Sequence, residues 1–161
     1  MSEWLGFTNQ KLYQARLLLD ASRRESGADV SGPAMKSGLE TGGLYLLHDA
    51  YVSYLNELAV LATYRGEVHS LKSLLDKTPL VTGEMTELRI LEEEPTSWLS
   101  AFLRETEAHG RPGNGASRQA GGMATNLIAL ANDSSADHQP LSWWQSLSDL
   151  IDSQRENRQE S

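Results

Sequence analysis

The stretch from Gly38 to Tyr64 constrains the fold more than any other part of this chain, because it is long, rich in apolar residues and free of proline. As a single helix it would extend about 40 Å. At about 100° per residue, its apolar side chains cover more than half of the helix circumference. An apolar arc of that width needs neighbours on more than one side. The stretch is therefore predicted to be the central helix of a bundle, with Leu47 and Leu58 in the core.

Shorter segments with helical spacing flank this stretch and are separated from one another by proline or glycine. Thr8 is predicted to cap the first of these helices, which ends near Arg24. The last helix is predicted to begin just after Pro140. The connections expected between helices include 25–38, the glycine-rich loop 110–122 and the polar stretch 132–140.

No run of alternating β-branched residues lies between turn signals, so no strand is predicted. The fold class is therefore all-α: a single-domain up-and-down bundle of five to seven helices around a long central helix. The domain is expected to span residues 1–154. Residues 155–161 are polar or charged, lack apolar side chains and are expected to fray.

Composition narrows the classes of function. The net charge of −8 argues against a broad grip on nucleic acid and against docking on an anionic membrane. The absence of cysteine excludes thiolate zinc sites and cysteine nucleophiles. The first ten residues show no basic segment followed by an apolar one, and no apolar run is long enough to span a membrane, so a cytoplasmic protein is expected.

Motifs that carry chemistry are largely missing. The sequence has no Gly-Lys-Ser/Thr, no His-Glu-x-x-His and no Gly-x-Ser-x-Gly. No histidine follows a glutamate at the three-residue spacing of helical di-iron sites. The acidic residues between Glu84 and Glu94 lack the spacing of a calcium loop and are interpreted as a solvated helix face. The chain is therefore expected not to be an enzyme and to carry no metal or cofactor.

Among the polar residues of the central stretch, two are of interest for function. His48 is interpreted as a hydrogen-bonded core histidine, and Glu57 as a carboxylate at a seam between helices. A catalytic pair is the alternative, although the two side chains point to different sides of the helix. The tyrosines at 13, 45, 51, 54 and 64 either line a pocket, as in a small-molecule sensor, or mark the edge of the bundle.

Four tryptophans suggest the leading hypothesis, an adaptor or regulatory bundle that acts by protein–protein interaction. Tryptophan is enriched at binding hot spots, and Trp143 and Trp144 are the candidate binding residues. Adjacent helical residues lie about 100° apart, so both can be buried only where two surfaces meet. Burial in the core is the alternative for Trp98 and for one of this pair. The expected partner is another protein or a second copy of the chain.

Three segments together resemble an uncharacterised family of small all-helical bacterial proteins, a domain of unknown function. They are TNQKLYQARLLLD (8–20), LYLLHDAYVSYLNEL (44–58) and a later SWL followed by a tryptophan-rich terminal helix. This resemblance implies a helical fold and assigns no chemistry.

A second resemblance rests on Arg104 and His109, which are five residues apart. HEPN-type helical bundles, some of which cleave RNA, carry an arginine and a histidine at such a spacing. The resemblance implies an RNA-directed bundle with Arg104 and His109 as catalytic residues. Glu105 and Glu107 lie between them, where their charge would repel RNA. The interaction hypothesis is therefore favoured.

Overall fold

The computed structural model describes residues 2–25, 31–112 and 126–160, with side chains in the last range from 139 onward. These residues form six α-helices and no strand. The helices are α1 (Glu3–Arg24), α2 (Gly32–Leu61), α3 (Leu71–Lys77), α4 (Gly83–Glu93), α5 (Trp98–His109) and α7 (Asn126–Glu160). The predictions of an all-α bundle and of five to seven helices are confirmed.

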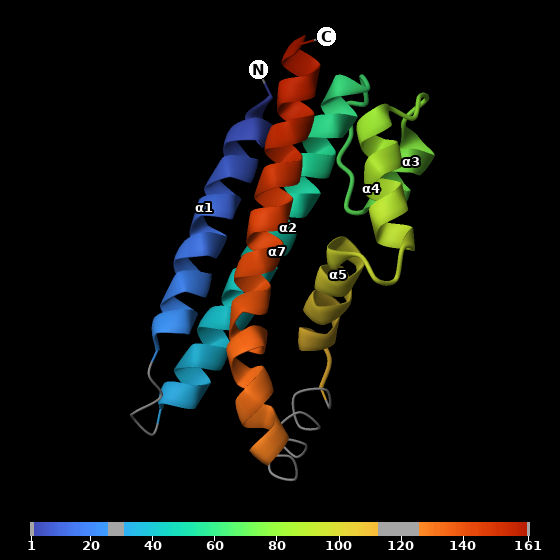
Figure 1. The fold of residues 1–161 in the computed structure, drawn as a ribbon. Helices are drawn as coiled ribbons and strands as arrows, with labels where there is room; N and C mark the ends of the chain where they lie inside the picture. The colour runs from blue at the N-terminus through green and yellow to red at the C-terminus, as the bar shows by residue number, and fades with distance from the viewer. Residues whose placement is uncertain (1, 26–30, 113–125, 161) are drawn as a thin grey trace.

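Three long helices, α1, α2 and α7, pack against one another, as Figure 1 shows. Helix α1 runs antiparallel to α2 and α7, and it contacts both of them. The shorter helices α3, α4 and α5 lie on the other side of α2 from α1. We call the end where α1 begins and where α2 and α7 finish the terminal end of the bundle.

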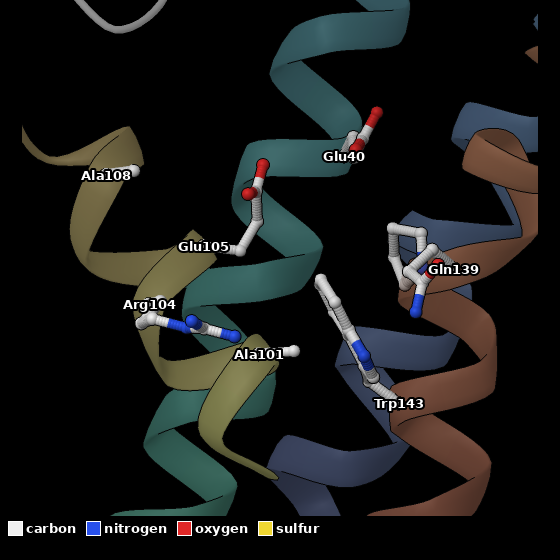
Figure 2. Close-up of a pocket in the computed structure, with 8 residues that line it drawn as sticks. Glu40, Ala101, Arg104, Glu105, Ala108, Gln139 and Trp143 are labelled. Carbon is white, nitrogen blue, oxygen red and sulfur yellow. The ribbon is translucent and has the colours of Figure 1, made fainter. Parts of the chain in front are cut away.

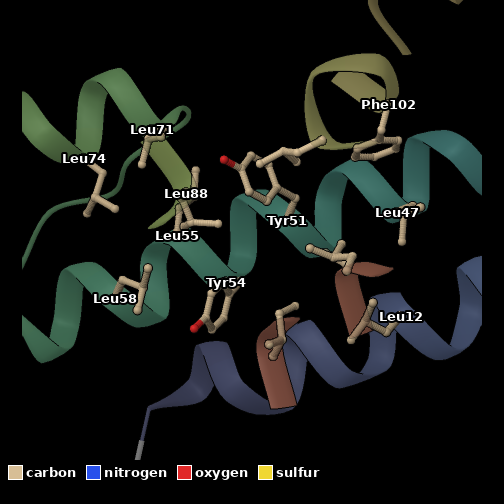
Figure 3. Packing of buried hydrophobic residues seen from close by; sticks show 14 of the residues in the cluster. Leu12, Leu47, Tyr51, Tyr54, Leu55, Leu58, Leu71, Leu74, Leu88 and Phe102 are labelled. Atoms are coloured by element: carbon tan, nitrogen blue, oxygen red, sulfur yellow. The ribbon is translucent and has the colours of Figure 1, made fainter. Parts of the chain in front are cut away.

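Helix α2 is the centre of the core, as the sequence predicts. It contacts α1, α3, α5 and α7, and Figure 3 shows buried side chains from neighbouring helices packed around it. Leu47 has no exposed surface and Leu58 is 2% exposed. The broad apolar arc of this helix is therefore covered on several sides. This agrees with the expectation that a helix with such an arc needs more than one neighbour.

Helix α1 approaches α2 closely at Gly43. A Cβ atom there would lie 2.6 Å from Cγ of Leu19 and 3.3 Å from its backbone nitrogen. At Gly38, earlier in α2, a Cβ atom would meet nothing within 4 Å. Gly43 is therefore required by packing, whereas Gly38 is not.

We expect Gly43→Ala to lower the free energy of unfolding by about 1–3 kcal/mol, because the added methyl group forces the two helices apart. Gly38→Ala should raise it by about 0.5–1 kcal/mol, since alanine loses less conformational entropy in a helix. Urea denaturation of both variants measures the difference. Equal effects of the two substitutions would contradict the close approach.

The first helix begins earlier than predicted. The side chain of Ser2 caps α1 by accepting a hydrogen bond from the backbone of Trp4 at 3.2 Å. Thr8, the predicted cap, is instead buried within the helix, where its hydroxyl lies 2.7 Å from that of Ser53 on α2. A hydroxyl residue near a helix start serves equally well as a cap or as a hydrogen-bonding partner inside the helix, so sequence alone did not distinguish Ser2 from Thr8.

Two proline positions also differ from expectation. Helix α2 begins at Gly32 rather than Gly38, with Pro33 in its first turn, where proline needs no hydrogen-bond partner. Pro140 lies inside α7 instead of preceding it, so the prediction of a helix starting after Pro140 is wrong. Proline removes only one backbone hydrogen bond from the helix interior, and the packing of the buried side chains that follow it offsets this loss. From residue 113 onward, the predicted loop 110–122 lies outside the described residues.

The end of the chain is helical through Glu160. The sequence predicts a frayed tail from residue 155, but Arg155 and Arg158 contact side chains on α2 and α4. Charged residues are usually solvated, and here they find partners on neighbouring helices. This difference brings two arginines to the terminal end of the bundle.

Candidate functional site

The adjacent tryptophans of α7 face two different helices. Trp143 is buried, and its ring centre lies 5.9 Å from that of Phe102 on α5. Trp144 is half-buried, and its indole nitrogen donates a hydrogen bond of 2.7 Å to the backbone oxygen of Leu12 on α1. The guanidinium of Arg16 lies 4.9 Å from the Trp144 ring centre. Two surfaces therefore do meet at this pair, and both rings are engaged within the chain.

Arg104 and His109 do not come together in the structure. The Nη2 atom of Arg104 donates a hydrogen bond of 3.0 Å to the backbone oxygen of Pro95. His109 faces α2, where its Nδ1 atom lies 3.2 Å from the hydroxyl of Thr41. Five residues along a helix correspond to a rotation of roughly 140°, so the two side chains point to different sides of α5.

Thr41, His109 and Glu105 form a chain of polar groups that the sequence did not suggest. The Nε2 atom of His109 lies 3.3 Å from a carboxylate oxygen of Glu105 but makes no hydrogen bond. The order hydroxyl, imidazole, carboxylate resembles a nucleophile with its base and orienting acid. The backbone N–H groups of Gly110 and Arg111, next to the imidazole, are engaged with helix carbonyls and offer no oxyanion hole. The contact between Thr41 and His109 joins α2 to α5.

A cavity of about 690 Å³ lies between α2, α5 and α7. Figure 2 shows Glu40 and Glu105 directed toward it, with the ring of Trp143 on the α7 side. Arg104 also lines the cavity and adds a positive charge to the two carboxylates. Because charges of both signs line the wall, the cavity does not indicate a particular class of ligand.

A second cavity, which we call the terminal cleft, opens at the terminal end and measures about 550 Å³. Two arginines of α7 and aliphatic side chains of α1 and α2 line it. The lining residues are Ser2, Leu5, Glu57, Val60, Leu61, Arg155, Arg158 and Gln159.

A buried ion pair borders the terminal cleft. Glu57 is 4% exposed, and both of its carboxylate oxygens accept hydrogen bonds from Nη2 of Arg155, at 3.0 and 2.9 Å. The Nη1 atom of Arg155 donates a hydrogen bond to Asn9 on α1 at 2.9 Å. The prediction that Glu57 lies at a seam between helices is confirmed. Arg155 was missed because it falls in a segment without apolar residues.

Tyr54 connects this end of the core to α7. Its hydroxyl donates a hydrogen bond to Oε1 of Gln154, and the Nε2 atom of Gln154 donates one to Glu87 at 2.9 Å. Burial raises the pKa of Tyr54 to about 12, although the nearby Arg158 guanidinium acts in the opposite direction. The hydroxyl therefore stays protonated at neutral pH and serves as a hydrogen-bond donor.

Tyr51 points toward α4. Its hydroxyl donates a hydrogen bond of 3.1 Å to Glu92. Burial raises the pKa of both groups; the Glu92 carboxylate further raises that of Tyr51, whereas the Tyr51 hydroxyl acts to lower that of Glu92. The hydroxyls of Tyr51 and Tyr54 therefore bond to different helices, α4 and α7.

His48 is separated from Glu57, as the sequence predicts. It lines a smaller cavity of about 400 Å³ with residues of α5, whereas Glu57 faces α7. Burial lowers the pKa of His48, and the charge of Asp49 partly opposes this effect. The imidazole is therefore neutral at pH 7. His48 is half-buried and lines this cavity, so the prediction of a core histidine is wrong.

The residues that the structure describes contain no group of three or more histidine, aspartate or glutamate side chains that could hold a metal ion. None of the described helices combines the length and apolar character needed to cross a membrane.

A central apolar helix, covered on several sides by other helices, defines this protein as an all-α bundle. The chain belongs to DUF6586, a family of unknown function whose family model matches residues 1–161. No curated protein and no solved structure matches the chain. The predicted resemblance to a domain of unknown function is confirmed. The family carries no assigned activity, and the match does not show the likeness to HEPN-type bundles.

Proposed function

We propose that this protein is a non-enzymatic adaptor or regulatory bundle that binds another protein through its terminal end. The observation that supports this proposal is a group of aliphatic side chains left exposed there, between 40% and 58% of their surface. The group comprises Leu5, Val60 and Leu61, which line the terminal cleft. Large apolar side chains exposed together at one end of a small protein indicate an interaction surface. Their burial against a partner is favourable, whereas their contact with water is not.

The partner is a protein of opposite net charge, with an apolar contact face. Two copies of a chain that carries a net charge of −8 repel each other before their apolar surfaces meet. A basic partner is attracted over the same distances at which two copies repel each other. This attraction raises its association rate and favours it over a second copy of the chain.

The test begins with a photo-crosslinking amino acid placed at Leu61, with Ser37 as the control site. Both positions are exposed on α2, near its two opposite ends. We expect a crosslink to one basic protein from position 61 and not from position 37. The crosslinked protein is then identified by mass spectrometry and purified for binding measurements.

With the purified partner, Leu61→Ser should raise the dissociation constant at least about tenfold, since it replaces an apolar contact with a hydroxyl group. Ser37→Ala should leave the dissociation constant unchanged. Raising the salt concentration should slow association, because the attraction between the two net charges is screened. Equal crosslinking from both positions, or a crosslink only to a second copy, would exclude this partner.

A further inference from the structure

We propose that the terminal cleft is a binding site for a small carboxylate with an apolar chain, of the class of medium-chain fatty acids. This inference goes beyond the proposed function and does not depend on it. It rests on how the charges and the aliphatic side chains of the cleft are arranged.

The cleft has an apolar wall built from two helices. Leu5 of α1 and Val60 and Leu61 of α2 line it, and all three side chains are substantially exposed. The volume of about 550 Å³ is in the range of small-molecule sites. An alkyl chain lying against these residues would remove apolar surface of both molecules from water.

One of the two arginines in the cleft is already neutralised. The Nη2 atom of Arg155 contacts both carboxylate oxygens of Glu57, at 3.0 and 2.9 Å, and its Nη1 atom is bonded to Asn9. The Arg155–Glu57 pair therefore contributes no net charge to the cleft.

Arg158 is the arginine with capacity for a ligand. Its Nη1 atom lies 3.5 Å from the Tyr54 hydroxyl and 3.8 Å from a carboxylate oxygen of Glu84, both at the outer limit of such contacts. The described part of the chain shows no other hydrogen bond to its guanidinium. A guanidinium presents parallel N–H groups that match the two oxygens of a carboxylate. The geometry therefore places a carboxylate at Arg158 and its chain along the aliphatic wall.

Glu84 is the charged group that competes with the ligand. Its carboxylate attracts the same guanidinium, although no hydrogen bond joins them at 3.8 Å. Ser2 and Gln159, which also line the cleft, are uncharged. Removing the charge of Glu84 should therefore strengthen ligand binding, while removing that of Arg158 should weaken it.

The test is titration of the full chain with octanoate by isothermal calorimetry. We expect saturable binding of one octanoate per chain. Arg158→Gln should weaken it at least about tenfold, the effect of losing a charged hydrogen bond. Glu84→Gln should strengthen it about threefold, because the partly buried carboxylate no longer competes for Arg158. Hexanoate should bind more weakly than octanoate, by roughly fourfold for each methylene removed.

Three controls separate this site from unspecific binding. Arg104→Gln, which alters the cavity between α2, α5 and α7, should leave octanoate affinity unchanged. Octanol and octylamine, which have the chain without the carboxylate, should bind more weakly than octanoate. Leu61→Ser, at an exposed position that folding does not require, should reduce the dependence of affinity on chain length.

Octanoate binding that is not saturable, that equals octanol binding, or that survives Arg158→Gln would overturn the proposal. A loss of affinity in Glu84→Gln would also contradict it. These measurements contain no partner protein, so their failure would leave the proposed protein–protein interaction standing. Failure of the crosslinking experiment would in turn leave the octanoate site standing.

Discussion

Replacing Arg155 with methionine is expected to lower the free energy of unfolding by about 3–5 kcal/mol, the usual cost of breaking a buried ion pair. The substitution keeps a long apolar side chain between α2 and α7 but removes every hydrogen bond to Glu57. Because Glu57 is only 4% exposed, its unpaired carboxylate would be poorly hydrated. Urea denaturation followed by circular dichroism measures the change.

Two controls show whether the effect comes from the unpaired charge. Replacing both residues, Glu57→Met together with Arg155→Met, should recover most of the loss, since apolar pairs often substitute for buried ion pairs without cost. Lys72→Met should have little effect, because the Lys72–Asp76 pair lies on the surface of α3. If the double variant is as unstable as Arg155→Met, packing rather than charge explains the loss.

The central helix was predictable because its signal is local. Apolar side chains repeat along one continuous segment, and the width of their arc shows how many neighbours the helix needs. The ends of the elements were less predictable. Ser2 and Thr8 carry similar hydroxyl groups, and only the position of Ser53 on α2 shows which of the two is buried. Pro140 shows the same limit, since packing of the residues that follow it decides whether the helix continues.

The polar partners could not be predicted, because each pair joins distant segments. Arg155 is 98 residues from Glu57, and His109 is 68 residues from Thr41. No short-range pattern connects such positions. The sequence instead indicated a solvated tail for Arg155, which is what charged residues without apolar neighbours usually form. Its role becomes visible only when α7 lies beside α2.

The surface that supports the proposed function differs from the one that composition suggested. Tryptophans are common at binding hot spots, so they were the natural candidates. Trp143 and Trp144 pack α7 against α5 and α1, and their part in binding a partner stays a prediction. The side chains left exposed at the terminal end are aliphatic, and aliphatic residues within a helical pattern are indistinguishable from core residues until the neighbouring helices are placed.

Leu47→Ala is expected to lower the free energy of unfolding by about 2–5 kcal/mol, and Leu61→Ala on the same helix by less than about 0.5 kcal/mol. Leu47 has no exposed surface and belongs to one buried cluster with Leu12 of α1 and Phe102 of α5. Removing its branched end leaves a cavity that three packed helices cannot close without shifting. Leu61 is 58% exposed, so its truncation leaves no such space.

Urea denaturation of both variants tests this contrast under one set of conditions. The chemical change and the helix are the same, so the difference between the two losses reports burial alone. Similar losses at both positions would mean that Leu61 is covered in the folded protein. The terminal end would then offer neither an exposed partner surface nor an open cleft, and both proposals for this end of the bundle would lose their structural basis.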